Sequence, residues 1–324
     1  MKILSSNLRE TVNILSDLNY HDGDSIGNKL GITRSAVWKI IKKLQDYGIK
    51  INSTKSKGYA LESTLRLLDE NYIKKSLSEQ DMEITVFESV ESTNDYLKNL
   101  GKINPIPRIC LAEYQTKGRG RHSRSWHAPF GQNLTFSYAY PIAKDVSELA
   151  GLSLVVGLSV INTLKEFNFP KKLSLKWPND ILYEDKKIVG ILIDVVAESN
   201  GQTYIIIGIG INVNMSHDEE NIITQKWDSL SNILGSYIDR NKLFTNLIKC
   251  LIAYLNKFEY QGFSAFADEF CLYDSLFDKQ IKVLSGNSEV QGMAIGINNL
   301  GHLLVQLAGG EIKICSSGDT TIIK

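Results

Sequence analysis

The sequence predicts an α+β protein of three units: a winged helix-turn-helix at the N-terminus, a central mixed or antiparallel sheet with helices, and a small C-terminal β-barrel. Three observations lead to this prediction. Short amphipathic helices separated by a glycine turn occupy the first sixty residues. Four β-rich runs follow one another closely between 173 and 214, and the last fifty residues alternate short strands with Gly and Asn turns. We therefore expect domains at 1–65, 66–273 and 274–324.

Length and charge set the first limits. The chain has 324 residues and 43% apolar content, which is enough for two or three packed cores. Its 36 basic and 36 acidic residues balance overall, but residues 1–60 hold ten Lys/Arg against five Asp/Glu. A small basic module on a mildly acidic body suggests that the N-terminal unit faces nucleic acid.

Cysteine spacing and hydropathy argue against other classes. The N-terminus lacks the apolar stretch of a signal peptide, and no apolar run reaches transmembrane length, so we expect a cytoplasmic protein without a membrane partner. The cysteines lack the paired spacing of a zinc site, so we expect reduced thiols and no fixed protein metal site. They are Cys110, Cys250, Cys271 and Cys315.

Apolar spacing predicts the first three helices. Residues 6–18 form the first, and a short helix over Asp24–Leu30 ends at Gly31, which suits a left-handed cap. Thr33 can cap a third helix that runs through about Tyr47. The residues expected to face inward are Leu8, Val12, Leu15 and Leu18 in the first helix and Val37, Ile40, Ile41, Leu44 and Tyr47 in the third.

The opposite face of the third helix is basic. The run GIKINSTKSKGYAL after it contains two β-rich segments around a Lys/Ser/Gly tip, as in a winged helix-turn-helix. The alternative is a three-helix domain whose lysines form only a solvated face. The residues expected to contact DNA are Arg34, Ser35, Trp38, Lys39, Lys42 and Lys43 on the helix and Lys55 and Lys57 in the hairpin.

The middle of the chain mixes strands and helices. Strand-like runs are EITVFESV, ICLAEYQ, NLTFSYAYP, LSLKW, ILYE, KIVGILIDVVAE and TYIIIGIGINVN. Short turns join the last four, so we expect antiparallel neighbours. Helices are expected over 69–77, 91–100, 146–167, 241–262 and 264–276.

The most unusual segment is the loop after ICLAEYQ, in which 117–124 read KGRGRHSR. Gly118 and Gly120 allow backbone N–H groups to approach an anion, and Arg119, Arg121 and Arg124 offer planar charge with several donors. No P-loop occurs in the sequence, and GIGINVN lacks the third glycine of a dinucleotide fingerprint. The loop is therefore the best anion-binding candidate, and the alternative is a flexible surface loop.

Four further positions carry two interpretations each. Lys176, at a strand end in KWPND, supplies a compact positive charge for a carboxylate or phosphate, or else protects a strand edge. ESTND at 91–95 caps a helix and also exposes free N–H groups. Trp126 either stacks on a heterocycle or packs in the core. Asn212, in an apolar strand, either ties down a loop or faces a ligand.

Taken in order, these features resemble the bacterial family of bifunctional biotin protein ligases and biotin operon repressors. The helix-turn-helix is followed by ESTN, EYQ…GRGR…W, KWPND, KIVGIL and GIGINVN, and by GGEI at 309–312. Each motif alone is weak, but six in this order span nearly the whole chain. The resemblance implies a class II synthetase-like biotin ligase domain in the centre and an SH3-like β domain at the C-terminus.

The resemblance also implies the activity. Biotin's carboxylate attacks the α-phosphate of MgATP, giving biotinyl-5′-AMP and pyrophosphate, and a lysine of the biotin carboxyl-carrier protein of acetyl-CoA carboxylase then displaces AMP. MgATP and biotin would be substrates, with no permanently bound cofactor. Biotinyl-AMP would act as corepressor, so that a homodimer forms and binds the operator DNA of biotin synthesis.

Matching the motifs residue by residue assigns the site. Lys176 and Arg121 are expected to be catalytic, since they would stabilise charge in the transition state, and the arginine loop would close as a lid. Biotin contacts are expected from Ser92, Thr93, Asn94, Gln115, Arg119, Gly120, Arg121 and Lys176. Nucleotide contacts are expected from Gly118, Arg119, Arg121, Trp126, Lys176 and Asn212.

Three departures from the family pattern stand out. His122-Ser123 replaces an Arg-Gly pair after GRGR, Trp38 lies on the exposed side of the recognition helix, and EIKIC lacks the arginine common near GGEI. The alternatives are a lipoate or octanoate ligase, a biotin-sensing repressor without ligase activity, and a ligase whose head does not repress.

Overall fold

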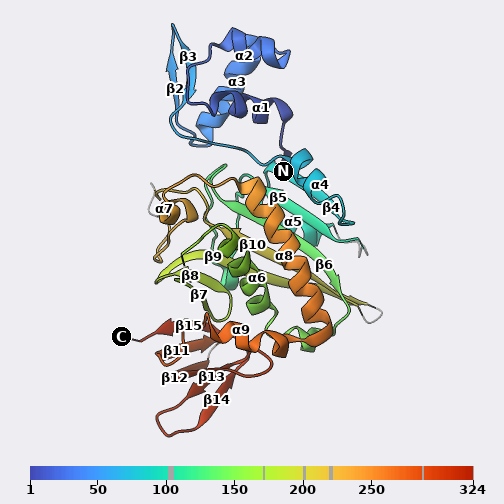
Figure 1. The fold of residues 1–324 in the computed structure, drawn as a ribbon, viewed down its shortest axis with the longest axis vertical. Helices are drawn as coiled ribbons and strands as arrows, with labels where there is room; N and C mark the ends of the chain where they lie inside the picture. Colours follow the sequence, from blue (N-terminus) through green and yellow to red (C-terminus); the bar gives the residue numbers. More distant parts are fainter. Residues whose placement is uncertain (101–105, 171, 200–201, 219–221, 287, 324) are drawn as a thin grey trace.

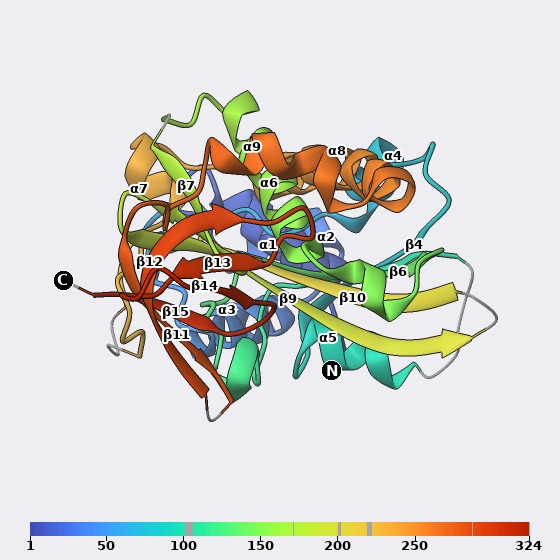
Figure 2. The same cartoon turned by 90° about the horizontal axis from the view of Figure 1, so that it is seen from below.

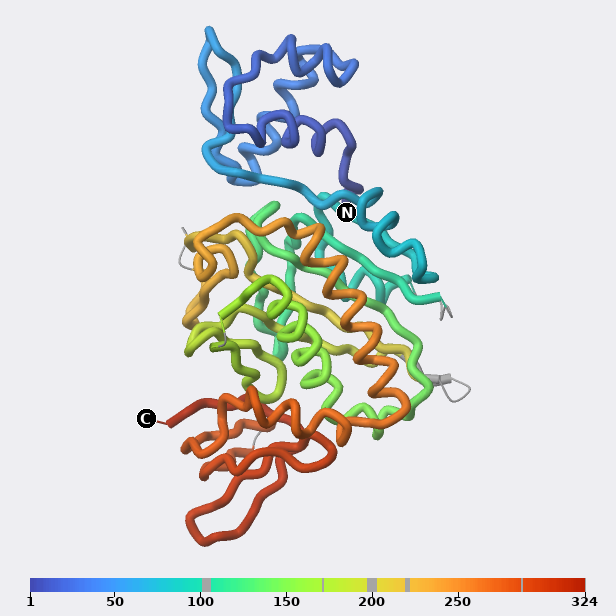
Figure 3. The backbone as a smooth tube through the Cα atoms, in the orientation of Figure 1, coloured from blue at the N-terminus to red at the C-terminus, as the bar shows by residue number. Residues whose placement is uncertain are grey.

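The computed structural model describes residues 1–324 apart from 101–105, 171, 200–201, 219–221, 287 and 324. Three units lie one after another along the long axis of the molecule, with the N-terminal helices at one end and the C-terminal strands at the other (Figure 1). Figure 3 shows the N-terminus at the junction of the first two units and the C-terminus on the last. Among the described residues, no helix is long and apolar enough to cross a membrane.

The N-terminal unit is a helix-turn-helix with a wing. Thr33 caps α3 by accepting from the Ala36 N–H at 3.2 Å, and Gly31 ends α2 with a φ of 65°, as expected. Gly58, with a φ of 92°, lies against the backbone of His21, which holds the wing to the helices. The elements are α1 (Ser6–Leu15), α2 (Gly23–Leu30), α3 (Arg34–Asp46), β2 (Ile51–Thr54) and β3 (Gly58–Leu61).

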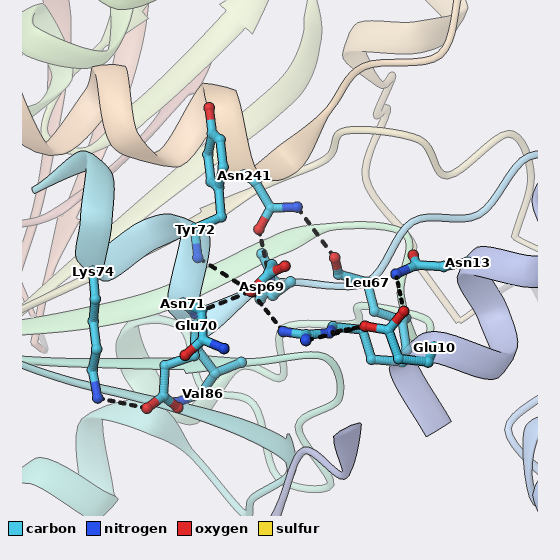
Figure 4. Close-up of polar contacts among 12 residues, drawn as sticks. Glu10, Asn13, Leu67, Asp69, Glu70, Asn71, Tyr72, Lys74, Val86 and Asn241 are labelled. Atoms are coloured by element: carbon cyan, nitrogen blue, oxygen red, sulfur yellow. Dashed lines mark hydrogen bonds and ion pairs between the residues drawn. The ribbon is translucent and has the colours of Figure 1, made fainter. Parts of the chain in front are cut away.

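A polar junction fastens this unit to the centre (Figure 4). Asp69 caps α4 (Glu70–Ser76) by accepting from two backbone N–H groups of its first turn, and its carboxylate also accepts from Arg9 Nη1 at 2.6 Å. Asn241 of α8 (Arg240–Gln261) accepts from the Asp69 N–H at 2.7 Å and donates to the Leu67 carbonyl at 3.1 Å. The first helix, the linker and α8 thus share one hydrogen-bonded junction.

A second junction involves the recognition helix itself. Glu88, at the end of β4 (Glu83–Ser89) and only 1% exposed, accepts from Lys43 Nζ at 2.5 Å and from the Tyr47 hydroxyl at 2.8 Å. The Tyr47 ring stacks on Phe130 with centroids 4.2 Å apart. Because these contacts are buried and paired, the head has a defined orientation on the central unit.

The central unit is built on one eight-stranded sheet in the order β1-β4-β5-β6-β10-β9-β8-β7. Only β4 and β5 are parallel, and the other neighbours are antiparallel, so the sheet is mixed, as the sequence predicts. Its strands are β1 (Lys2–Ile3), β4, β5 (Arg108–Ala112), β6 (Leu134–Ile142), β7 (Leu173–Lys176), β8 (Asp180–Tyr183), β9 (Lys186–Ser199) and β10 (Gln202–Ile211).

Helices cover both faces of the sheet. Figure 2 shows α6 (Leu152–Glu166) and α8 on one side and α5 (Thr93–Asn99) on the other. Side chains from α6, α8 and the strands bury one large apolar core, whereas α5 packs Leu97 into a smaller cluster with Phe87 and Ile206. Helix α5 therefore packs directly on the sheet.

The C-terminal unit is a five-stranded antiparallel sheet in the order β14-β13-β12-β11-β15. Its strands are β11 (Gln280–Ser285), β12 (Ser288–Ile297), β13 (Leu303–Gln306), β14 (Ile312–Cys315) and β15 (Asp319–Ile322). Its buried residues join the large central core, so the unit is packed onto the centre rather than tethered to it.

Several sequence-predicted boundaries are wrong. The first helix ends at Leu15, and Leu18 lies in a turn with a φ of 63° and is 45% exposed. The helix expected over 146–167 is broken at Gly151, whose φ of 77° lets it sit against the ring of Phe263. The strand expected to reach Gln115 ends at Ala112.

The region expected to be one helix over 264–276 is a short 3₁₀ turn, η3 (Phe263–Phe266), followed by α9 (Ala267–Cys271). A second 3₁₀ turn, η2 (Val146–Leu149), precedes Gly151. Sequence reasoning also missed β1, which pairs with β4, and α7 (Leu230–Leu234). Both missed elements are short, so their apolar periodicity is too weak to detect.

Candidate active site

A cavity of about 560 Å³ opens between the central sheet, the arginine loop and β15. Five Lys/Arg side chains and two Asp side chains line it, so it favours anions. Of the residues predicted to bind biotin or nucleotide, those lining the cavity are Ser92, Thr93, Asn94, Gln115, Arg119, Gly120, Arg121, Trp126, Lys176 and Asn212.

Gly118 is the one predicted site residue outside this lining. It is buried at the base of the loop, where its carbonyl accepts from the Trp126 N–H at 2.8 Å. A Cβ on Gly118 would approach the Trp126 carbonyl oxygen to 2.5 Å. Position 118 therefore requires glycine because the backbone packs closely there. This packing holds the two ends of the loop together.

The first residues of α5 form a buried hydrogen-bond network at one end of the cavity. Gln115 Oε1 accepts from the Thr93 N–H at 2.8 Å and from the Thr93 hydroxyl at 3.2 Å. Ser137 of β6 donates to Asn94 Oδ1 at 2.5 Å, and Asn94 Nδ2 donates to Asp194 Oδ2 of β9 at 3.1 Å. The amide of Asn94 is thus held at both ends, and it lies over Gly208, where a Cβ would come within 3.0 Å of Asn94 Cγ.

The arginine loop is internally hydrogen-bonded. The Gly120 N–H donates to the Arg124 carbonyl at 2.7 Å, and Arg119 and Ser125 form an isolated antiparallel bridge. His122 and Ser123 at its tip have φ angles of 50° and 57°, in the left-handed region. Such a conformation in two residues that carry Cβ atoms costs energy, and the loop's own contacts must offset that cost.

Lys176 lies half-buried at the end of β7, facing the cavity. Burial lowers its pKa, an effect that neighbouring Lys187 reinforces and Asp180 opposes. Lys187 Nζ pairs with Asp180 Oδ1 at 2.8 Å. Burial likewise lowers the pKa of Arg121, whereas Asp319 and Asp180 act in the opposite direction. An incoming anion would favour the charged form of both cations.

Trp126 covers a flat part of the sheet. Gly190 and Gly210 face each other on β9 and β10, and a Cβ on Gly210 would come within 2.7 Å of the indole Cζ2. Lys187 Nζ lies 5.5 Å from the Trp126 ring centroid. The indole N–H is buried and has no acceptor among the described residues, so it is a donor that a bound ligand can satisfy.

Asn212, left open between two interpretations, ties down a loop. Its side chain donates to the Asp228 carbonyl at 3.1 Å, and its backbone N–H donates to the Ile188 carbonyl at 2.9 Å. It is 4% exposed, so the structure supports the first interpretation, and it also lines the cavity.

Sequence reasoning missed part of this site. Asp180, Lys187 and Asp319 line the cavity, and Ser137 and Asp194 hold Asn94. Asp180, Lys187 and Asp319 belong to charged turns and strand ends that also suit solvent. Two signals were available: Asp194 is a carboxylate in the apolar run ILIDVV of β9, and Ser137 is a small, completely buried polar residue in the apolar strand β6.

The head presents most of its predicted DNA-facing residues to solvent. Seven of them are exposed: Arg34, Ser35, Trp38, Lys39 and Lys42 on α3 and Lys55 and Lys57 at the tip of the wing. Lys43 lies apart from this surface, because its ammonium is paired with Glu88 of the central unit. Sequence periodicity could not distinguish Lys43 from the other basic residues of α3, because its partner Glu88 is 45 residues away along the chain.

Three family models match the chain in the same order as the three units. They are a helix-turn-helix domain over 8–60, the biotin/lipoate A/B protein ligase family over 86–212, and the biotin protein ligase C-terminal domain over 276–320. Fold and site thus define the class: a protein ligase of the biotin/lipoate type that carries a helix-turn-helix head.

Comparison with curated proteins narrows the class. The bifunctional ligase/repressor BirA of Salmonella typhimurium is 35% identical over 94% of this chain and 97% of its own length, and that of Escherichia coli is 33% identical over 94% and 96%. The chain belongs to this family of bifunctional biotin protein ligases and biotin operon repressors, which confirms the resemblance found in the sequence. Its activity is that of a biotin–[acetyl-CoA-carboxylase] ligase, joined to a DNA-binding repressor head.

Solved structures agree with this assignment. The biotin protein ligase from Aquifex aeolicus in complex with biotin and ATP superimposes with a TM-score of 0.63 at 30% identity, covering 75% of this chain and 99% of that chain. The α+β fold class predicted from sequence is therefore confirmed.

Proposed function

We propose that the cavity binds biotin and MgATP side by side and that its residues act as matched from the sequence. The observation that carries this proposal is the gathering of Arg119, Arg121, Arg124, Lys176 and Lys187 around one cavity that ends in a buried network of neutral polar groups. The cationic part suits two anions that must be brought together, and the neutral part suits an uncharged ring with polar edges.

The biotin end lies at the start of α5. Asn94 and Gln115 have amide groups fixed by Thr93, Ser137 and Asp194, so they present donors and acceptors in a set geometry to the ureido ring. Ser92 and Thr93 add hydroxyl groups nearby. Fixed partners reduce the cost of ordering the site when the ligand arrives.

The reaction centre lies at Lys176 and Arg121. A biotin carboxylate oxygen forms a bond to the α-phosphorus while the bond from that phosphorus to the bridging oxygen breaks, releasing pyrophosphate and leaving biotinyl-5′-AMP. Lys176 and Arg121 neutralise the charge of the two reacting anions, which is the main barrier to their approach. In the second step an uncharged lysine amine of the carrier protein attacks the biotin carbonyl, and AMP leaves.

The nucleotide end lies over Gly190 and Gly210. Trp126 already rests on this glycine surface, and its aromatic ring and indole N–H without an acceptor suit a heterocycle with hydrogen-bond acceptors. Asn212 holds the loop before α7 beside it. Gly120, which lines the cavity, lets the lid close tightly on the adenylate, whereas Gly118 holds the two ends of the lid together. Magnesium enters with the nucleotide as part of the substrate.

The first experiment is biotin-dependent exchange of labelled pyrophosphate into ATP, comparing wild type with Lys176→Ala. We expect exchange that requires biotin and is lost in the variant while circular dichroism stays unchanged. Lys172→Ala, a change on the same edge of the sheet at an exposed pair with Glu184, is the matched control. Exchange retained in Lys176→Ala would overturn the role of Lys176, and absence of exchange in a wild type that binds biotin would overturn the proposed adenylation. Lipoate in place of biotin tests the related ligase class.

We also propose that biotinyl-AMP promotes a homodimer that binds operator DNA. Strand β8 pairs with β9 only as far as Gly190, so in the described part of the chain the later residues of β9 have a strand neighbour on one side only. Val195 and Val196 on this stretch are 43% and 38% exposed. A free strand edge with exposed apolar side chains suits pairing with a second copy, or with an extended segment of the carrier protein.

Two measurements test this part. Sedimentation with and without biotin plus ATP should show dimerisation that depends on both ligands. Operator binding should weaken steeply with salt, because the exposed basic residues of α3 and the wing would neutralise phosphates. A dimer that binds no biotin operator would mean that the head no longer represses.

The remaining assignments follow from the function. Domain boundaries at 1–65, 66–273 and 274–324 are supported by the three family matches, each of which falls within one of these ranges. We also propose that the protein works in the cytoplasm, where its substrates and the biotin carboxyl-carrier protein of acetyl-CoA carboxylase would be found.

A further inference from the structure

The C-terminal unit reaches into the active-site cavity through the first residues of β15. Thr320 is buried, and its hydroxyl donates to the Trp177 carbonyl at 2.9 Å, next to Lys176. The Trp177 indole N–H donates to the Gly301 carbonyl at 3.0 Å, in the same unit. Strand β15 is thus hydrogen-bonded to Trp177, the residue that follows Lys176. The C-terminal unit makes this contact even though it lacks the arginine that is common near GGEI.

Asp319, the neighbour of Thr320, faces the lid. Its Oδ2 accepts from Arg124 Nη2, and its Oδ1 lies 3.7 Å from Arg121 Nη1 and 3.5 Å from His122 Nε2. The Asp319 and Arg121 side chains are 21% and 22% exposed and so partly shielded from water, whereas those of Arg124 and His122 are 67% and 54% exposed. One carboxylate of the C-terminal unit therefore accepts a hydrogen bond from Arg124 and lies within 4 Å of basic nitrogens of Arg121 and His122.

The other side of the lid is held by the central unit. Arg119 Nη2 pairs with Asp95 at 2.5 Å and with Asp194 at 3.4 Å. The lid spans the cavity between these carboxylates and Asp319. Without a counter-charge on the far side, Arg121 and Arg124 would repel each other and Lys176, and the loop would lose its position over the cavity.

We propose that Asp319 is a positioning residue for adenylation: it anchors the lid to the C-terminal unit before substrate binds, so that Arg121 and Arg124 already face the place where the phosphates will lie. A triphosphate carries more charge and more acceptor oxygens than one carboxylate, so it draws the two arginines from Asp319 when it enters. The anchor thus lowers the cost of ordering the lid during capture of ATP and takes no part in the chemical step. This inference rests on the proposed function of the cavity.

Asp319→Asn tests the anchor, because it removes the charge and keeps the size. Limited trypsin digestion of the full chain, read by mass spectrometry at Lys117, Arg119, Arg121 and Arg124, should show faster cleavage in the ligand-free variant. Biotin plus ATP should remove the difference. In pyrophosphate exchange the KM for ATP should rise about fivefold, as expected for loss of a partly exposed charge contact, while kcat stays within about twofold.

Two further variants make the result specific. Glu289→Gln removes a carboxylate of the same unit, which pairs with Lys282 on the surface, and should change neither cleavage nor KM. Asp319→Glu keeps the charge, so its rate of lid cleavage and its KM for ATP should both stay close to the wild-type values. If Asp319→Asn digests like wild type, or if its KM for ATP falls, the anchor is refuted.

The test also separates this inference from the function on which it rests. If the wild type shows no pyrophosphate exchange, the proposed adenylation fails. The digestion of the ligand-free lid still reports on Asp319, since it needs no catalysis. If exchange is normal and the lid is equally protected in Asp319→Asn, only the anchor fails.

Discussion

The ion pair between Arg240 and Glu113 gives the sharpest test of how the central unit is held together. Both side chains are completely buried, and Arg240 Nη1 donates to Glu113 Oε2 at 2.7 Å. Arg240 also donates to the Asn133 carbonyl at 3.0 Å and to the Arg66 carbonyl at 2.8 Å. One side chain at the start of α8 thus joins the interdomain linker, β5 and the entry to β6.

Replacing Arg240 with Met keeps the volume and removes the charge, so Glu113 is left buried and unpaired. Removal of one partner of a buried pair costs about 3–5 kcal/mol, mainly because the remaining charge stays desolvated. We expect Arg240→Met to lower the free energy of unfolding by about this amount. Adding Glu113→Gln should recover more than half of the loss, because the amide oxygen still accepts from the Leu68 N–H, as Glu113 Oε1 does in the wild type.

The assay is urea unfolding followed by tryptophan fluorescence in a Trp38→Phe background. The remaining tryptophans, Trp126, Trp177 and Trp227, all lie between 66 and 273, so the signal reports on the central unit. Arg108→Met, which breaks a more exposed pair with Glu83, is the control and should cost about 1 kcal/mol or less. A loss under about 1 kcal/mol for Arg240→Met, or a double variant no more stable than the single one, would refute the reasoning.

Three further outcomes are expected. Because burial lowers the pKa of Lys176, the rate of adenylation should decline with rising pH at a lower pH than an ordinary lysine would cause. Lys176→Arg stays charged, so it should move this decline to higher pH in a profile of kcat/KM. An unmoved profile would contradict the role of Lys176. Gly210→Ala should displace Trp126 and raise the KM for ATP about tenfold with little effect on biotin, and equal effects on both would argue against the nucleotide end. Glu88→Gln should weaken the docking of the head, because it removes the charged partner of Lys43. Amide hydrogen exchange in α3 should become faster, while pyrophosphate exchange into ATP stays normal. Unchanged protection in α3 would show that the pair adds nothing to docking.

Local patterns in the sequence were enough to find the head and most strands. The caps at Thr33 and Gly31 and the apolar spacing of Val37, Ile41 and Leu44 depend on neighbours within a few residues. The break at Gly151 was missed because its cause, the ring of Phe263, is distant in sequence. A helical period continues through such a glycine, so only the packed structure shows where the helix stops.

The candidate site divides in the same way. The motifs around Ser92, Gln115, Arg121 and Lys176 could be predicted as a binding set because each stands within a short pattern, and the structure brings all of them to one cavity. Asp319 could not be found, since its partners in the lid are almost two hundred residues away and nothing in its own neighbourhood is unusual.

By itself, the sequence determined the order of the units, the family, and the cationic residue types of the candidate site, because these depend on local propensity and on short motifs. Only the tertiary structure decided which charges are paired. It turned Lys43 away from the DNA-facing surface toward Glu88, and it placed Asp319 against the lid. The physical reason is that a charge interacts over a few ångströms of space, whatever the number of residues between the partners along the chain.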